Sequence, residues 1–212
     1  MNPPAMTTDN SFDFRHVLLA PLLALGLALS GCNSGPPAPT QADWPLAGAS
    51  IGGDFTLVNK DGETVTWDDF AGEWRIVYLG YTFCPDVCPV DAAAIAAGLN
   101  QFEETDPERA AKVTPIFITV DPERDTPEVV GEFAAAFHPR MVGLTGSEEQ
   151  IAEAAKAFVA TYSRGEVQDN GFYRVDHTAN TMLFDPTGQP VAILETHQGP
   201  QVLADELAKW VQ

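Results

Sequence analysis

The sequence is poor in basic residues. Only 11 of its 212 residues are lysine or arginine, whereas 30 are aspartate or glutamate, so the formal net charge is −19 at pH 7. A surface of this sign repels phosphate backbones, which argues against nucleic acid as a partner. The charge favours solubility and attracts cations or basic protein surfaces, although a solvated acidic face is the simpler explanation.

Long hydrophobic runs are also lacking. The apolar segment at residues 17–30 has 14 residues, which is short for a bilayer crossing but suits the core of a signal peptide. It ends in Leu29-Ser30-Gly31-Cys32, which resembles the lipobox of bacterial lipoproteins, where cleavage precedes a cysteine whose thiol carries diacylglycerol. We therefore predict a signal peptide at 1–31 and a lipid anchor on Cys32, with an uncleaved short anchor as the alternative. Either version places the chain outside the cytoplasm, anchored at the periplasmic face of the bacterial inner membrane.

Beyond the leader, the sequence predicts one domain. Residues 32–50 are rich in small residues and proline and show no apolar period, which predicts a flexible linker. Residues 51–212 have the length of a single domain and contain no internal repeats. Burial of apolar residues alone can stabilise a chain of this size, so disulfide bonds are not required for folding.

The apolar pattern of residues 51–212 predicts a mixed α/β fold. The turn sequence at residues 59–62, NKDG, predicts an N-terminal β-hairpin, and alternating strand and helix patterns in the middle predict parallel βαβ units. The predicted strands are Phe55–Val58, Thr64–Trp67, Arg75–Phe83, Val113–Val120, Met141–Leu144, Thr181–Phe184 and Val191–Leu194. The predicted helices are Pro89–Glu104, a segment capped by Asp125 that ends at Phe137, Ser147–Ala160 and Gln201–Val211, with 161–180 less regular. This order is that of a thioredoxin-like fold with an N-terminal β-hairpin and a central mixed sheet flanked by helices.

Cysteine is scarce, and each of the three residues has a distinct context. Cys32 belongs to the predicted anchor, whereas Cys84 and Cys88 form a local pair between a buried strand and the next helix. Open α/β sheets place their sites at this end of a strand. A helix N-terminus also favours a thiolate there and lowers its pKa.

The spacing of the pair favours a metal over a disulfide. Three residues separate Cys84 from Cys88, whereas thioredoxin-type redox motifs have two. A helical spacing of four holds Cβ atoms about 5–6 Å apart, which is wider than the ~3.8 Å of a disulfide. A looped backbone would still allow a disulfide, and two buried structural cysteines are the plain alternative.

His177 is the best placed of the four histidines to complete a metal site. His16 lies in the predicted leader, His138 at a helix end and His197 after the last strand. In a thioredoxin-like sheet, the loop that contains His177 faces the cysteine loop and usually carries a cis-proline, which this sequence lacks. A ligand and an ordinary loop histidine fit this position equally well. Asp176 is a candidate to orient His177, or a turn residue.

The donor set itself indicates which metal to expect. Two thiolates and one imidazole form a soft set that suits Cu(I), and Cu(II) with added ligands. Zinc fits less well, because closed structural zinc sites take four protein ligands.

Three segments, taken together, resemble the Sco/SenC family of copper proteins. They are YTFCPDVCP at 81–89, DPERDTP at 121–127 and VDHTA at 175–179. The resemblance implies a thioredoxin fold that binds one copper through Cys84, Cys88 and His177. It also implies a role in maturing the CuA centre of cytochrome c oxidase subunit II, by copper delivery, by reduction of the target cysteines, or by both. A copper donor protein is a further implied partner.

The resemblance maps the family's acidic signature to Asp121, Glu123, Arg124 and Asp125. These residues are candidates for partner docking or for ordering a loop, and helix capping already accounts for Asp125.

Three functions therefore compete, and whether the chain is an enzyme stays open. The first is a copper metallochaperone, and the second is a thiol–disulfide oxidoreductase in which Cys84 and Cys88 cycle and His177 tunes a thiolate. The third is a peroxidase-like redox sensor. The spacing, the missing loop proline and His177 favour the first. Nothing in the sequence indicates an obligate assembly, so we expect a monomer.

Overall fold

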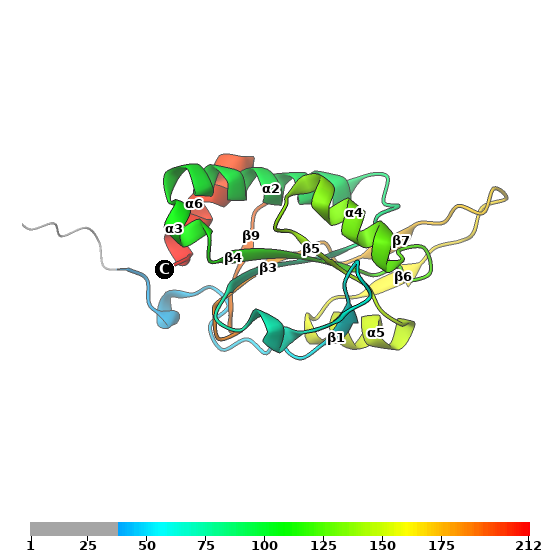
Figure 1. Ribbon diagram of the computed structural model, residues 1–212, viewed down its shortest axis with the longest axis horizontal. Helices are drawn as coiled ribbons and strands as arrows, with labels where there is room; N and C mark the ends of the chain where they lie inside the picture. The colour runs from blue at the N-terminus through cyan, green and yellow to red at the C-terminus, as the bar shows by residue number, and fades with distance from the viewer. Residues whose placement is uncertain (1–37) are drawn as a thin grey trace, which may run out of the picture. The chain divides into compact units, whose positions relative to one another are not determined.

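The computed structural model describes residues 38–212 (Figure 1). The predicted signal peptide and the predicted lipidation site Cys32 lie outside the described residues. Within residues 38–212, no helix combines the length and the hydrophobicity that a bilayer crossing requires.

A five-stranded mixed sheet forms the centre of the domain, in the order β5-β4-β3-β8-β9. Its strands are β3 (Trp74–Gly80), β4 (Val113–Thr119), β5 (Val142–Leu144), β8 (Thr181–Phe184) and β9 (Pro190–Leu194). The pairs of β3 with β4 and of β4 with β5 are parallel, whereas β8 runs antiparallel to both of its neighbours. All seven residues of β3 are buried. This burial explains why the strand is apolar throughout except for Arg75, rather than alternating.

Helices cover both faces of this sheet (Figure 1). One face carries α2 (Val87–Thr105), α4 (Pro127–Phe137) and α6 (Pro200–Trp210), with the short α3 (Pro107–Ala110) following α2. The other face carries α5 (Glu148–Ala157), together with the hairpin of β1 (Thr56–Val58) and β2 (Thr64–Thr66) and the 3-10 helix η2 (Trp67–Phe70). The central mixed sheet flanked by helices confirms the predicted fold class.

The starts of α2 and α4 differ from the prediction in ways that concern the site. Helix α2 begins at Val87 rather than at Pro89, so Cys88 lies inside its first turn. Helix α4 is capped by Thr126, whose Oγ1 accepts a hydrogen bond from the Val129 amide. The prediction that Asp125 caps this helix is therefore wrong. Its carboxylate is buried and has other partners.

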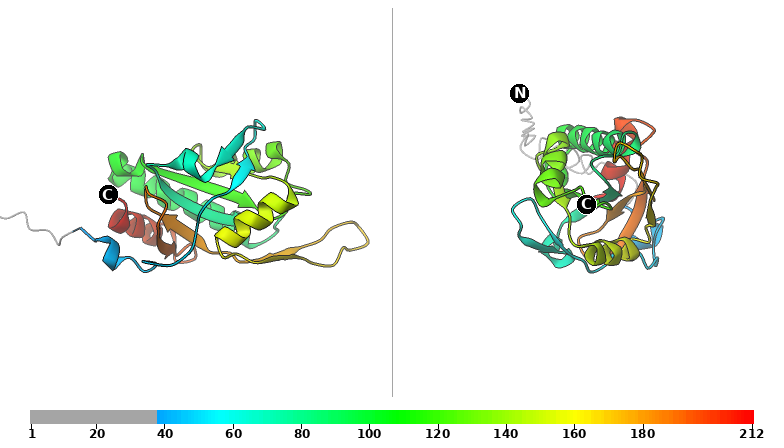
Figure 2. Two further views of the ribbon diagram at one scale, coloured as in Figure 1. Left: turned by 90° about the horizontal axis from the view of Figure 1, so that it is seen from below. Right: turned by 90° about the vertical axis from the view of Figure 1, so that its right-hand side faces the viewer.

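A third hairpin occupies the region that the sequence predicts to be irregular. Strands β6 (Tyr162–Arg164) and β7 (Val175–His177) pair antiparallel, and Tyr162 lies opposite His177. The hairpin projects beyond the sheet in Figure 1 and in the left view of Figure 2. Its strands are short and partly exposed, so they lack the hydrophobic alternation that marks a half-buried strand.

The second half of the predicted linker lies against the domain. Residues 41–43 form the 3-10 helix η1 (Gln41–Asp43), and Trp44 packs against the hydrophobic core. The Leu46 amide donates to the Val191 carbonyl oxygen at 3.1 Å. Contacts with the domain therefore begin before residue 51, which was the expected boundary. Burial of the large Trp44 side chain stabilises this arrangement even in a proline-rich segment.

Helix α5 ends in a turn that normally requires glycine. The Ala160 amide donates to the Ala155 carbonyl at 2.8 Å and the Val159 amide donates to the Lys156 carbonyl at 3.1 Å, which together form a Schellman motif. Val159 occupies its left-handed position with a φ of 52°. A β-branched residue is strained in this region, because its Cβ crowds the following carbonyl.

Replacing Val159 with glycine is expected to stabilise the protein. Relief of the left-handed strain exceeds the added entropy of the unfolded chain, so Val159→Gly should raise the free energy of unfolding by about 1 kcal/mol. Urea denaturation measures the change. Val159→Ala is the matched control, because alanine keeps the Cβ and should recover less than half of the gain. A Val159→Gly protein less stable than wild type would contradict the assignment of strain.

Candidate metal centre

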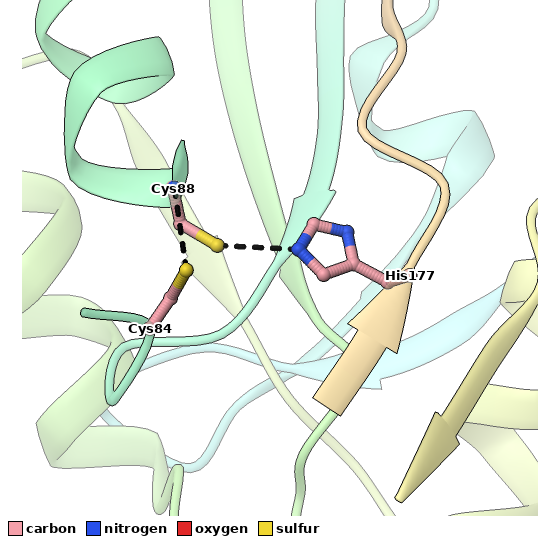
Figure 3. Close-up of side chains that lie close together, drawn as sticks. All are labelled: Cys84, Cys88 and His177. Carbon is pink, nitrogen blue, oxygen red and sulfur yellow. Dashed lines mark hydrogen bonds between the residues drawn. The ribbon is translucent and has the colours of Figure 1, made fainter. Parts of the chain in front are cut away.

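Three segments bring one soft ligand each to the carboxyl end of β3. Cys84 lies in the turn after β3, Cys88 in the first turn of α2, and His177 at the end of β7. Figure 3 shows the three side chains turned toward one another. Residues that are far apart in the sequence thus meet because α2 starts where β3 ends and the β6–β7 hairpin returns to the same place.

The ligand atoms are close enough to share one ion. His177 Nε2 lies 3.3 Å from Cys88 Sγ, and the Cys84 and Cys88 sulfurs and an imidazole nitrogen all lie within 4.8 Å of one another. Both cysteines are free, and the Cys88 amide donates to Cys84 Sγ at 3.5 Å. Among the described residues, this is the one cluster of His, Cys, Asp and Glu that can hold a metal.

The two thiols differ in their tendency to ionise. Burial disfavours the thiolate of Cys84, but hydrogen bonds from the Cys88 thiol and from the backbone amides of Cys88 and Asp86 outweigh it, so the pKa of Cys84 is lowered. Burial, reinforced by the adjacent Cys84, raises the pKa of Cys88 well above its ordinary value. Cys84 is 9% exposed and Cys88 is 0% exposed. Both sulfurs are therefore largely buried, and Cys84 is the more easily ionised and the slightly more exposed of the two.

The backbone, not Asp176, orients the imidazole of His177. His177 Nδ1 lies 3.1 Å from the Thr178 carbonyl oxygen. A carbonyl can only accept, so Nδ1 carries the proton and Nε2, which faces Cys88, has a free lone pair. Tyr81 packs edge-on against the ring, with centroids 5.8 Å apart. Asp176 is exposed, and its place next to His177 on a strand directs its side chain to the opposite face. The predicted orienting role of Asp176 is not supported.

The acidic signature orders the cysteine loop through Asp125. Its carboxylate accepts hydrogen bonds from the Thr82 amide at 2.9 Å, from the Thr82 hydroxyl at 2.6 Å and from the Thr119 hydroxyl at 2.6 Å. Asp125 is fully buried, and burial raises the pKa of its carboxyl against the effect of these hydrogen bonds. Thr82 precedes Cys84 by two residues, so this contact fixes the backbone that carries the first ligand.

The same signature also holds the hairpin that carries His177. The Tyr173 hydroxyl donates to Asp121 at 2.8 Å. The Arg124 guanidinium donates to Asp121 and to the Tyr173 carbonyl, and it stacks 3.6 Å from the Tyr173 ring centroid. Arg164 stacks on the same ring at 3.8 Å and pairs with Glu123. Residues 121–125, hereafter the 121–125 turn, therefore contact both ligand-bearing segments.

The remaining histidines of the described chain lie away from this centre. His138 is buried at the end of α4, burial lowers its pKa, and its Nδ1 accepts from the Arg140 amide. His197 is largely exposed and lies near Asp91. Sequence reasoning missed Tyr81 and Tyr173. Tyr81 opens the segment at 81–89 and could have been found there, whereas Tyr173 lies outside the three segments and left no such signal.

Comparison with known proteins identifies the family of the chain that forms this centre. Residues 45–212 match the SCO1/SenC family. The chain belongs to the SCO1/SenC family. SenC of Rhodobacter capsulatus is 42% identical over 161 residues, which cover 76% of this chain and 71% of that protein. The mitochondrial SCO1 homolog 1 of Arabidopsis thaliana is 38% identical over 169 residues, which cover 79% of this chain and 49% of that protein. The SCO1/SenC chain thus spans about half the length of this plant relative.

A solved SCO1/SenC structure supports the fold and the metal. The crystal structure of Arabidopsis thaliana ScoI with copper bound superposes with a TM-score of 0.70 at 38% identity. The match covers 75% of this chain and 96% of the ScoI chain.

The difference between the two thiols predicts an order of reaction in the reduced, metal-free SCO1/SenC protein. Iodoacetamide reacts with thiolates, so near pH 7.5 it should modify Cys84 before Cys88, because the pKa of Cys84 is lowered and that of Cys88 is raised. Mass spectrometry of peptides taken over time measures the order. In the Cys84→Ser variant, iodoacetamide should still modify Cys88 slowly. Equal rates for both cysteines in the wild type would contradict the prediction.

Loss of the Tyr173 side chain should loosen the strand that carries His177. Tyr173→Leu removes the stack with Arg124 and the hydrogen bond to Asp121, so amide exchange in β7 should speed up about tenfold. Hydrogen–deuterium exchange measures this, with α6 as an internal reference. Phe172→Leu is the matched control, because Phe172 makes neither a hydrogen bond nor a cation–π contact with the 121–125 turn. Unchanged exchange in β7 of Tyr173→Leu would show that the turn does not hold the hairpin.

Proposed function

We propose that this protein binds one copper ion through Cys84, Cys88 and His177 and acts in the assembly of cytochrome c oxidase. The observation that carries the proposal is the convergence of two sulfurs and an imidazole nitrogen within 4.8 Å. Two thiolates and an imidazole are a soft donor set that suits Cu(I), and Cu(II) with added ligands. The copper in the related Arabidopsis ScoI structure supports the same choice of metal.

The geometry of the centre fits an ion of this kind. Sulfur and nitrogen donors bound to one ion at about 2.0–2.3 Å lie roughly 3.5–4.6 Å from each other. The observed spread of up to 4.8 Å requires only a small closing movement. Because Cys84 and Cys88 must lose their protons, binding becomes tighter as pH rises.

Within this role, we assign the protein to copper delivery to the CuA centre of subunit II. A copper donor protein would load the site, and a lipid on Cys32 would hold the domain at the periplasmic face of the membrane. Three ligands leave the ion open to an incoming thiolate, which supports transfer by ligand exchange rather than permanent storage. Delivery requires no enzymatic turnover.

Reduction of the target cysteines is a second candidate, favoured by the different pKa values of the pair. The Cys84 thiolate would attack one sulfur of a target disulfide, form a mixed disulfide and release one target thiolate. Cys88 would then attack the Cys84 sulfur and release the second target thiolate. Two electrons pass to the target and a Cys84–Cys88 disulfide remains, so each further cycle needs an external dithiol reductant.

The variant His177→Ala separates the two candidates. It removes a copper ligand but neither thiol, so Cu(I) affinity should fall by more than about 100-fold. Reduction of a model disulfide by the reduced, metal-free protein should continue within about threefold of wild type, because both sulfurs remain. Competition with a chromophoric Cu(I) chelator measures affinity, and thiol release from the disulfide measures reduction.

The control is His197→Ala, which removes an exposed imidazole outside the centre and should leave Cu(I) affinity unchanged. Wild-type affinity in His177→Ala would overturn the ligand assignment. If His177→Ala loses both copper binding and disulfide reduction, the imidazole also supports the thiolate chemistry.

A further inference from the structure

Exposed apolar side chains gather around the cysteine pair. Six large hydrophobic residues are exposed in the described chain, and three of them lie within residues 83–90, namely Phe83, Val87 and Val90. Phe83 is 48% exposed and Val90 is 54% exposed. Single exposed apolar residues are ordinary, but a group at one place marks a surface that another molecule covers. We call these three residues the apolar rim.

The apolar rim lies beside both cysteine ligands in the chain. Phe83 directly precedes Cys84, the more exposed of the two cysteines, and Val87 directly precedes Cys88. Val87 and Val90 are three residues apart in α2, so they share one face of its first turn. The Arg124 guanidinium lies 5.1 Å from the Phe83 ring centroid, within the range of a cation–π contact. A molecule that reaches Cys84 therefore has to contact this rim.

The charges next to the rim restrict what can cover it. Asp86, within the rim segment, and Asp176, next to His177, are exposed, and neither has an ion-pair partner among residues 38–212. These carboxylates disfavour an anionic lipid surface, and the net charge of −19 disfavours a second copy of the chain. A protein with an apolar contact and a neutral or basic border fits best.

We propose that the apolar rim is the docking surface for the protein that accepts copper from this site. The inference rests on the proposed delivery function and adds the surface that recognises the acceptor. Ligand exchange needs an acceptor sulfur within about 2.3 Å of the ion. At that distance the acceptor's backbone lies against Phe83 and the first turn of α2, and burial of their side chains stabilises the encounter complex.

Transfer of Cu(I) to the acceptor in this complex is a ligand exchange in which the oxidation state of copper does not change. Bonds from Cu(I) to Cys84, Cys88 and His177 break one after another as bonds to thiolates or imidazoles of the acceptor form. Acceptor thiols release protons when they bind the ion, and the vacated thiolates of Cys84 and Cys88 take protons up. No electron donor or acceptor is required.

The test tracks copper from the loaded protein to the purified, reduced, metal-free soluble domain of cytochrome c oxidase subunit II, under anaerobic conditions. The double variant Phe83→Ser with Val90→Ser removes most of the exposed apolar surface of the rim. Its second-order transfer rate should fall about tenfold, as expected for loss of central interface contacts. The matched control Ile193→Ser changes a side chain that is 44% exposed on β9 and should transfer at the wild-type rate.

The outcomes separate this inference from the function on which it rests. Cu(I) affinity is measured for each variant, and a rate loss explained by changed affinity would overturn the rim as a docking surface. Transfer by the wild type and the rim variant at equal rates would overturn the rim alone. No transfer by the wild type would overturn the delivery function and the inference with it. Rim-dependent dimerisation in sedimentation, or rim-dependent binding to phosphatidylglycerol vesicles, would assign the rim to a second copy or to a membrane instead.

Discussion

The approach of His177 to the cysteine pair depends on the 121–125 turn. Its carboxylates hold two segments that would otherwise be free to move: Asp125 accepts hydrogen bonds from the loop before Cys84, and Asp121 accepts one from Tyr173 on the hairpin before His177. An exposed hairpin of short, partly exposed strands has little apolar burial of its own to fix its position. The buried polar contacts and the stack of Arg124 on Tyr173 supply that constraint.

The two sulfurs differ in burial and in the pKa of their thiols. Cys84 is 9% exposed and has a lowered pKa, whereas Cys88 is fully buried beside His177 and has a raised pKa. In the proposed function, an incoming ligand or disulfide therefore meets Cys84 first. The two proposed chemistries, copper transfer and thiol exchange, would then start from the same atom and differ only in their later steps. The fold alone does not determine whether the site transfers copper or exchanges thiols, and the same three residues can support either reaction.

The sequence predicted the sheet and the clustering of Cys84, Cys88 and His177 well because both leave strong local signals. The buried strand β3 is apolar except for Arg75, and the spacing of the cysteines with the position of His177 pointed to the three residues that the structure brings together. The β6–β7 hairpin could not be predicted, because its stability comes from tertiary contacts rather than from a hydrophobic period. Asp125 has the local pattern of a helix cap, yet the burial of its carboxylate among Thr82 and Thr119 is a non-local contact. Such non-local contacts decide the role of a residue against its local helix-capping propensity, and a single sequence gives no signal of them.

X-ray absorption spectroscopy of the reduced, copper-loaded protein tests the central claim most directly, because it counts the atoms bound to the ion. The account predicts two sulfur neighbours and one nitrogen neighbour with the multiple scattering of an imidazole, and loss of that scattering in His177→Ala. A shell of sulfur alone, or of nitrogen and oxygen alone, in the wild-type protein would contradict a centre formed by Cys84, Cys88 and His177.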